Sequence, residues 1–231
     1  MVGMLALGLT AASLALAADA SAAFTSGMRV LFQGDSITDG NRGRNADPNH
    51  ILGHGYAFLI AAKYGAALPG RNLTFLNRGV SGNTVADLAR RWQPDTIALA
   101  PDLLSILIGI NDASRAVPVE EFEKAYDELL ASTVAALPHV RLVLGEPFTL
   151  PVGKHKADWE TWRAEIAKRQ QAVARLAQKY HATLVRYQAA FDDACRRAPA
   201  DYWIWDGIHP TYSGHQIMAE AWEAAVAAAQ R

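Results

Sequence analysis

The stretch from Arg29 to Gly40 constrains this chain more than any other. An apolar run rich in β-forming residues stops abruptly at Gly34-Asp35-Ser36, and polar, turn-prone residues follow. This pattern predicts a buried strand whose end passes into a tight turn that carries Ser36. Ligands of open α/β sheets bind just beyond the carboxyl ends of the strands, so Ser36 is well placed for a nucleophile.

Gly-Asp-Ser alone is weak evidence for catalysis. Asp and Ser are both common in turns and at the N-termini of helices, so a simple turn or helix cap explains the motif equally well. A catalytic serine also needs a base, a group that orients the base, and donors for the developing oxyanion. Later segments of the sequence contain candidates for these parts.

Strand-like and helix-like segments alternate along the chain. Strands are expected near 29–33, 72–77, 103–108, 140–144 and 182–186, and helices near 56–64, 84–91, 119–137, 157–180, 188–197 and 211–230. Pro94 is expected to break or restart the second helix, and residues 202–210 to form a loop. Such alternation predicts an α/β fold with a five-stranded parallel sheet and helices on both faces. We find no repeat or linker that suggests a second domain.

Composition excludes several classes of function. The chain has 231 residues, 51% of them hydrophobic, which is enough to bury a full core. Its formal net charge is −1, so no global field favours nucleic acid or an anionic membrane. Cys195 is the only cysteine, which rules out an intramolecular disulfide and a cysteine-based zinc site. No metal is expected.

Residues 1–23 read as a signal peptide. Met4 to Ala18 is an uncharged run rich in Ala and Leu, followed by the small-residue patterns Ala18-Asp19-Ala20 and Ala20-Ser21-Ala22. These patterns predict cleavage after Ala20, Ala22 or Ala23. The usual basic residues before such a run are missing, and a loosely structured apolar tail is the alternative. The run is short for a membrane span. We expect a secreted or periplasmic protein whose domain covers residues 24–231.

Asp206-Gly207-Ile208-His209 can supply the base and its orienter. An Asp three residues before a His can accept from the ring Nδ1–H, which leaves Nε2 free to take a serine proton. An incidental histidine in a surface loop is the plainer alternative. For the oxyanion we expect three donors: the Ser36 N–H, the Gly79 N–H and the Asn111 amide. A simple turn would also explain Gly79, and an Asx-turn at a strand end would explain Asn111.

Taken together and in order, these segments resemble the SGNH (GDSL-type) hydrolases over nearly all of residues 28–225. The matching blocks are Gly34-Asp35-Ser36, Asn77-Arg78-Gly79-Val80-Ser81-Gly82, Gly109-Ile110-Asn111-Asp112 and Asp206-Gly207-Ile208-His209-Pro210. The resemblance implies a flavodoxin-like three-layer α/β/α sandwich and ester hydrolysis through an acyl-enzyme, with no cofactor. It also implies Ser36 as nucleophile, His209 as base and Asp206 as its partner, with Gly79 and Asn111 in the oxyanion hole.

The amino-acid sequences of the motifs are most similar to those of the acetylxylan-esterase-like bacterial branch of that family. This favours short-chain acyl esters, above all O-acetyl groups on carbohydrate. Aromatic residues beside His209 could stack on a sugar ring or pack the loop onto the core. Substrate contacts are expected from Asp35, His54, Trp203 and Trp205.

Three other functions compete with this interpretation. A thioesterase or lysophospholipase would use the same site, and acyl-chain length would distinguish it. A carbohydrate-binding module without catalysis is disfavoured by the intact Ser36, Asp206 and His209. A flavodoxin-like nucleotide binder is disfavoured because no Gly-rich phosphate loop follows the first strand. The sequence does not determine the oligomeric state, and a homo-oligomer is possible.

Overall fold

A computed structural model describes residues 21–230, and the signal-peptide prediction falls almost entirely on residues 1–20, outside this range. The described chain contains a five-stranded sheet with the order β2-β1-β3-β4-β5, in which every pairing is parallel. The strands are β1 (Arg29–Gly34), β2 (Thr74–Asn77), β3 (Leu103–Leu107), β4 (Arg141–Gly145) and β5 (Thr183–Val185). This strand order is that of flavodoxin-like folds, so the predicted fold class is confirmed.

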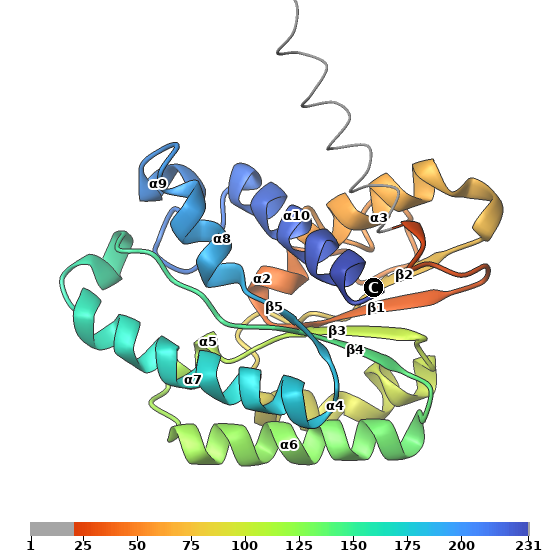
Figure 1. The fold of residues 1–231 in the computed structure, drawn as a ribbon, viewed down its shortest axis with the longest axis horizontal. Helices are drawn as coiled ribbons and strands as arrows, with labels where there is room; N and C mark the ends of the chain where they lie inside the picture. Colours follow the sequence, from red (N-terminus) through yellow and green to blue (C-terminus); the bar gives the residue numbers. More distant parts are fainter. Residues whose placement is uncertain (1–20, 231) are drawn as a thin grey trace, which may run out of the picture.

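Helices cover both faces of the sheet (Figure 1). One face carries α3 (Tyr56–Ala67), α8 (Tyr187–Ala194), α9 (Ala200–Trp203) and α10 (Tyr212–Ala228). The other carries α4 (Val85–Asp95), α6 (Val119–Ala136) and α7 (Trp159–Lys179). Short helices α2 (Ser36–Asp39) and α5 (Ile110–Ser114) follow β1 and β3 directly, and 3-10 turns lie at Pro69–Arg71, Ile97–Leu99 and Gly153–Lys156.

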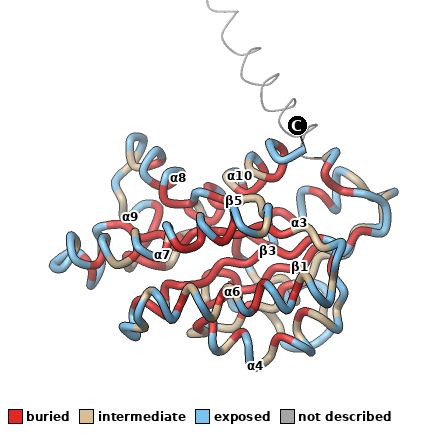
Figure 2. The backbone as a smooth tube through the Cα atoms, turned by 60° about the horizontal axis from the view of Figure 1, so that its bottom comes forward, coloured by how far each residue is buried: buried red, intermediate tan, exposed pale blue. Residues whose placement is uncertain are grey.

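The core lies in two layers, one on each side of the sheet. All five residues of β3 are buried, as expected for a central strand covered on both faces. Trp222 of α10 is fully buried on the first side, where Phe24 stacks near it with ring centroids 6.4 Å apart. Figure 2 shows the buried strands between helices that expose only their outer sides.

The topology fixes where a site can form. β1 pairs with β2 on one side and with β3 on the other, so the chain direction across the sheet reverses at the β1–β3 boundary. Ligands bind at such a switch point, beyond the carboxyl ends of the strands. The turn after β1 carries Ser36, and α5 after β3 carries Asn111.

Two local predictions need correction. Pro94 lies inside α4, in its last turn, and the helix continues to Asp95. A proline there removes one hydrogen bond near the helix end without breaking the helix. The segment expected to be a loop begins with the short helix α9, and Ile204 pairs with Pro210 in an antiparallel bridge. Among the described residues, no helix is both long and apolar enough to cross a membrane.

Candidate active site

Ser36 is the first residue of α2, immediately after the end of β1. The Asp35 side chain caps this helix by accepting the Ile37 N–H at 3.0 Å. Because Ser36 stands in the first turn, its own N–H has no partner within the helix. The turn therefore presents both the Ser36 hydroxyl and its N–H at the carboxyl edge of the sheet.

His209 reaches Ser36 from the other end of the described chain. The Ser36 Oγ and His209 Nε2 atoms lie 2.8 Å apart, and His209 Nδ1 lies 2.7 Å from Asp206 Oδ2. The second carboxylate oxygen of Asp206 accepts the N–H groups of Ile208 and His209, at 2.9 and 2.7 Å. The structure thus brings the three predicted catalytic side chains into one chain of hydrogen bonds.

The loop that carries Asp206 and His209 is tied to the core. The Gly207 carbonyl accepts the Thr149 hydroxyl at 2.8 Å and the Leu150 N–H at 3.3 Å. Burial would raise the pKa of Asp206, but the hydrogen bonds from His209 and Ile208 outweigh it and lower the pKa. The carboxylate is therefore held in its charged form, as a partner for an imidazolium must be.

Asn111 lies in α5, beside the Ser36 turn. One hydrogen of its side-chain amide binds the Asn83 carbonyl at 3.0 Å, which fixes the orientation of the amide. An amide nitrogen carries two donor hydrogens, so one remains for a substrate. The position of Asn111 is therefore suitable for the expected hydrogen-bond donor to the oxyanion.

Gly79 does not offer the donor that the sequence suggests. Its N–H donates to the Asn77 side chain at 2.9 Å, in the buried interior. A Cβ atom at this position would lie 2.4 Å from the Asp39 nitrogen, so glycine is required here for close packing against α2. The prediction that Gly79 supplies an oxyanion donor is wrong for this reason.

Gly82, three residues later, was not among the residues expected at the site. Its N–H has no acceptor among the described residues, and its φ is +80°. Val80 donates to the Gly34 carbonyl beside the Ser36 turn, and the Asn83 carbonyl binds Asn111. Gly82 therefore lies in a loop anchored on one side to the nucleophile turn and on the other to Asn111.

The four expected substrate contacts divide into two pairs. Trp205 is 65% exposed, and its ring stacks beside His209 with centroids 6.2 Å apart. His54 is exposed, and it lies close enough to His215 to lower the pKa of that side chain. These two residues remain candidates for substrate contacts.

Asp35 and Trp203 are not available to a substrate. Asp35 is 1% exposed and holds the N-terminus of α2. Trp203 belongs to the core, where its indole N–H donates to the Ala198 carbonyl at 3.2 Å. The prediction that these two residues contact substrate is therefore wrong.

Buried titratable groups surround the site. Burial, and then the nearby Asp112, raise the pKa of Asp35 to about 7, against the opposing effect of the Ile37 N–H. Burial, with smaller contributions from His54 and His209, lowers the pKa of His215 to about 4. The neutral His215 ring accepts the Tyr56 N–H at 3.2 Å and thereby fastens the start of α3 to α10.

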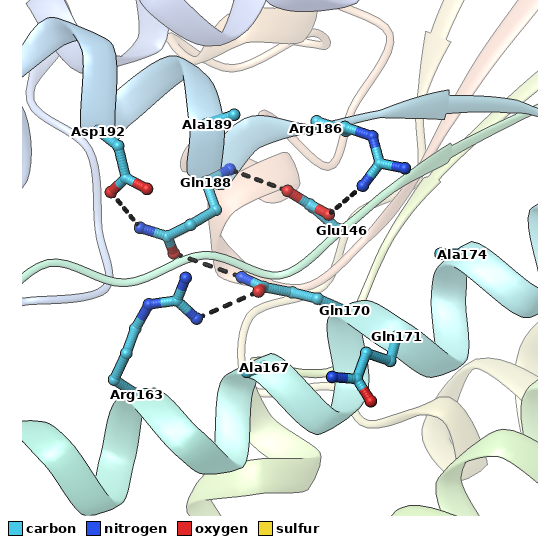
Figure 3. A pocket seen from close by; sticks show the side chains of 10 residues that line it. All are labelled: Glu146, Arg163, Ala167, Gln170, Gln171, Ala174, Arg186, Gln188, Ala189 and Asp192. Atoms are coloured by element: carbon cyan, nitrogen blue, oxygen red, sulfur yellow. Dashed lines mark hydrogen bonds and ion pairs between the residues drawn. The ribbon is translucent and has the colours of Figure 1, made fainter.

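A polar pocket of about 310 Å³ lies at the ends of β4 and β5, between α7 and α8 (Figure 3). The Gln188 side chain bonds to Asp192 at 2.8 Å and to Gln170 at 3.3 Å, and Glu146 accepts the Gln188 N–H. None of the predicted site residues lines this pocket. Its polar groups largely bind one another, and we assign it no function. Among residues 21–230, no cluster of three His, Cys, Asp or Glu side chains is arranged to hold a metal.

Comparisons with known proteins agree with this geometry. The sequence model of the GDSL-like lipase/acylhydrolase family matches residues 32–217. An acetylxylan esterase from Geobacillus stearothermophilus is 32% identical over 208 residues, which cover 85% of this chain and 92% of that protein.

Solved structures give the same result. The crystal structure of that esterase, Axe2, has a TM-score of 0.77 at 32% identity and covers 88% of this chain and 95% of the other. A protein from Parabacteroides merdae, described as GDSL-like, has a TM-score of 0.83 at 36% identity and covers 88% and 97%. This chain belongs to the GDSL-like lipase/acylhydrolase family and is a carboxylic ester hydrolase.

Proposed function

We propose that the enzyme cleaves short-chain esters, above all O-acetyl groups on carbohydrate, through an acyl-enzyme on Ser36. The observation that carries the mechanism is the continuous chain from Ser36 through His209 to Asp206, with steps of 2.8 and 2.7 Å. Nucleophile, base and orienter within hydrogen-bond reach are the requirement for acyl transfer to a serine.

In the first half-reaction, Ser36 Oγ attacks the ester carbonyl while His209 Nε2 takes the hydroxyl proton. The C–O bond to the alcohol then breaks, and His209 returns the proton to the departing alcohol. In the second half-reaction, water attacks the acyl group on Ser36, again losing its proton to His209. The bond between the acyl carbon and Ser36 Oγ then breaks, His209 returns the proton to Ser36 Oγ, and the acid leaves. Asp206 keeps Nδ1 protonated and stabilises the imidazolium in both steps.

Three groups are proposed to bind the oxyanion: the N–H of Ser36, the N–H of Gly82 and the free hydrogen of the Asn111 amide. Neither N–H has an acceptor among the described residues, and the Asn111 amide is oriented by Asn83. Pre-aligned donors of this kind stabilise charge that develops only in the transition state.

The carbohydrate part of the proposal is supported by Trp205 and by the likeness to Axe2. Trp205 exposes an aromatic face beside the proposed base, where a sugar ring can stack against it. Acetate release should therefore be measured from acetylated xylo-oligosaccharides, p-nitrophenyl acetate and long-chain esters. We expect acetylated oligosaccharides to give the highest kcat/KM. A preference for long-chain esters would instead favour a thioesterase or lysophospholipase.

A Trp205→Ala variant tests the stacking contact. We expect KM for acetylated oligosaccharides to rise about tenfold while kcat/KM for p-nitrophenyl acetate stays within twofold, because only the sugar needs the aromatic face. Phe58→Ala, which removes an aromatic side chain of 40% exposure on α3, is the matched control. Equal losses on both substrates would contradict a role in sugar binding.

We also propose that residues 1–23 contain an export signal. The burial of Phe24 supports a mature domain that includes this residue. Cleavage after Ala20 would retain Ser21, whose carbonyl accepts an Arg71 hydrogen bond at 2.6 Å. The mass of the protein recovered outside the cytoplasm tests this proposal. Recovery of uncleaved protein only in the cytoplasm would contradict it.

A further inference from the structure

The segment Val80 to Asn83 forms a tight turn. The Asn83 N–H donates to the Val80 carbonyl at 3.2 Å, and Gly82 has a φ of +80°. A positive φ at the third position is characteristic of a type II turn, whereas a type I turn has a negative φ there. The two forms differ by a rotation of the central peptide of roughly 180°. That peptide joins Ser81 to Gly82, so the turn type decides which way the Gly82 N–H faces.

Asp39 holds Ser81, the residue that precedes this peptide, through its side chain and the N–H of the Val80–Ser81 peptide. Its Oδ2 atom accepts both the N–H of Ser81, at 3.0 Å, and the Ser81 hydroxyl, at 2.9 Å. Asp39 is the last residue of α2, the one-turn helix that begins with Ser36. The carboxylate therefore joins the Val80–Asn83 turn directly to the helix that carries the nucleophile.

Arg44 keeps the Asp39 carboxylate charged and oriented. The two guanidinium nitrogens bind the two carboxylate oxygens at 3.0 and 2.8 Å, and the Arg42 N–H adds a bond at 3.1 Å. Asp39 is only 2% exposed, and its burial would raise the pKa. Hydrogen bonds from Arg44 and Ser81 outweigh burial and lower the pKa of Asp39, so it remains a strong acceptor.

The second half of the turn is held through its carbonyls. Arg115 donates to the Gly82 carbonyl at 2.7 Å, and Asn111 donates to the Asn83 carbonyl at 3.0 Å. Neither contact binds Ser81. Asp39 is the acceptor that holds Ser81, and its loss would leave the Ser81–Gly82 peptide freer to rotate.

We propose that Asp39 is a positioning residue for the oxyanion site: it holds Ser81, and thereby keeps the Gly82 N–H directed toward the carbonyl oxygen of the bound ester. This inference rests on the proposed function, because it assigns Gly82 as an oxyanion donor. Asp39 acts through the turn and does not contact the substrate. Its effect should therefore appear in kcat, where transition-state stabilisation is measured, and much less in KM.

Asp39→Asn is the first test, assayed on p-nitrophenyl acetate. We expect kcat to fall about 10–100-fold and KM to change less than threefold, since partial loss of one donor costs less than its removal. Phosphonylation by a fluorophosphonate, which forms a similar oxyanion, should slow by a similar factor. The matched control is Asp127→Asn, which removes the charge of an Asp paired with Lys179 at 2.7 Å on the opposite layer. It should leave kcat unchanged.

Rescue by proline separates positioning from general stability. Pro-Gly at the central positions favours a type II turn without any partner for the first N–H. Adding Ser81→Pro to Asp39→Asn should therefore recover at least about tenfold of the lost kcat. If Asp39 merely supported the fold, this substitution would restore nothing. An unchanged kcat in Asp39→Asn, or a loss that proline does not recover, would overturn the proposal.

A variant at the protein surface keeps the test decisive if Asp39→Asn does not fold. Arg44 is 53% exposed, and Arg44→Ala removes the main partner of the same carboxylate. A kcat loss of about 3–10-fold, again recovered by Ser81→Pro, is expected from the weaker hold on the turn. Loss without recovery would contradict the inference. Ser36→Ala is assayed alongside: if it remains active, the proposed function fails, and if it is inactive, the Asp39 result stands on its own.

Discussion

His209 Nδ1 lies 2.7 Å from Asp206 Oδ2, and the same Asp accepts the backbone N–H of His209 through its other oxygen. One short loop thus fixes both the orientation of the imidazole ring and its tautomer. The Nε2 atom is left facing Ser36 at 2.8 Å. The proposed base is therefore aligned before any substrate arrives, so the conformational entropy of the imidazole is lost on folding and not during catalysis.

Asp206→Asn should lower kcat by about 10³–10⁴ with little change in KM, because an amide can donate to Nδ1 and stabilise the wrong tautomer. The hydrogen bonds that lower the pKa of Asp206 should keep it ionised throughout the neutral range. Steady-state kinetics on p-nitrophenyl acetate between pH 5 and 9 would measure both effects. A loss smaller than tenfold would contradict the assigned role.

Gly82→Ala should lower kcat by about 10²–10³ while the fold is retained. The nearest atom to an added Cβ is an Arg115 nitrogen 3.8 Å away, so the side chain has room. The backbone of an alanine residue, however, disfavours the φ of +80° that Gly82 adopts, and the turn is expected to change form. Kinetics together with thermal unfolding would separate a loss of kcat from a loss of stability.

Gly65→Ala is the control for that experiment. Gly65 lies within α3, and an added Cβ would meet open space. Alanine there should stabilise the protein by about 0.5–1 kcal/mol and leave kcat unchanged. If Gly82→Ala retained the kcat of Gly65→Ala, the conformation of the turn at Gly82 would not control the proposed oxyanion stabilisation.

The sequence predicted the sheet and its strand ends, because apolar runs that stop at polar turns are local signals. Its motifs also pointed to the three side chains that the structure brings together, Ser36, His209 and Asp206. It could not choose between Gly79 and Gly82, since both are glycines in one turn-rich segment. The choice depends on where the Asn77 side chain points, because its oxygen accepts the Gly79 N–H. Tertiary bonds from the Asn77 amide to the Thr38 and Leu52 carbonyls fix that direction. One signal was available: a type II turn requires glycine at its third position, and Ser81-Gly82 fits that pattern.

Asp35→Asn should stabilise the protein at neutral and alkaline pH. The pKa of buried Asp35 is raised from 3.8 to about 7, so the folded state favours the neutral acid. The cost of ionising it grows as pH rises from about 4 to 7, and above pH 7 it reaches about 4 kcal/mol. The Asn oxygen can still accept the Ile37 N–H. Denaturant unfolding of Asp35→Asn and of the unmodified protein at pH 4 and pH 8 would test this. If the two proteins differed in free energy of unfolding by the same amount at both pH values, the prediction would be contradicted.

Burial also explains the errors at Asp35 and Trp203. Proximity in sequence to Ser36 or His209 suggested substrate contact, but neighbouring residues point in different directions. Trp203 faces the core, whereas Trp205, two residues later, is 65% exposed. The short helix α9 and the bridge from Ile204 to Pro210 set these directions, and neither was recognised in the sequence.

The central claim is that Ser36 is the nucleophile and that His209 activates it. Labelling the enzyme with a fluorophosphonate, followed by peptide mass mapping, tests this most directly. We expect one phosphonyl group per chain, located on Ser36, no labelling of Ser36→Ala, and labelling of His209→Ala slowed by at least about 10³. A label on any other residue, or ester hydrolysis that persists in Ser36→Ala, would contradict the account.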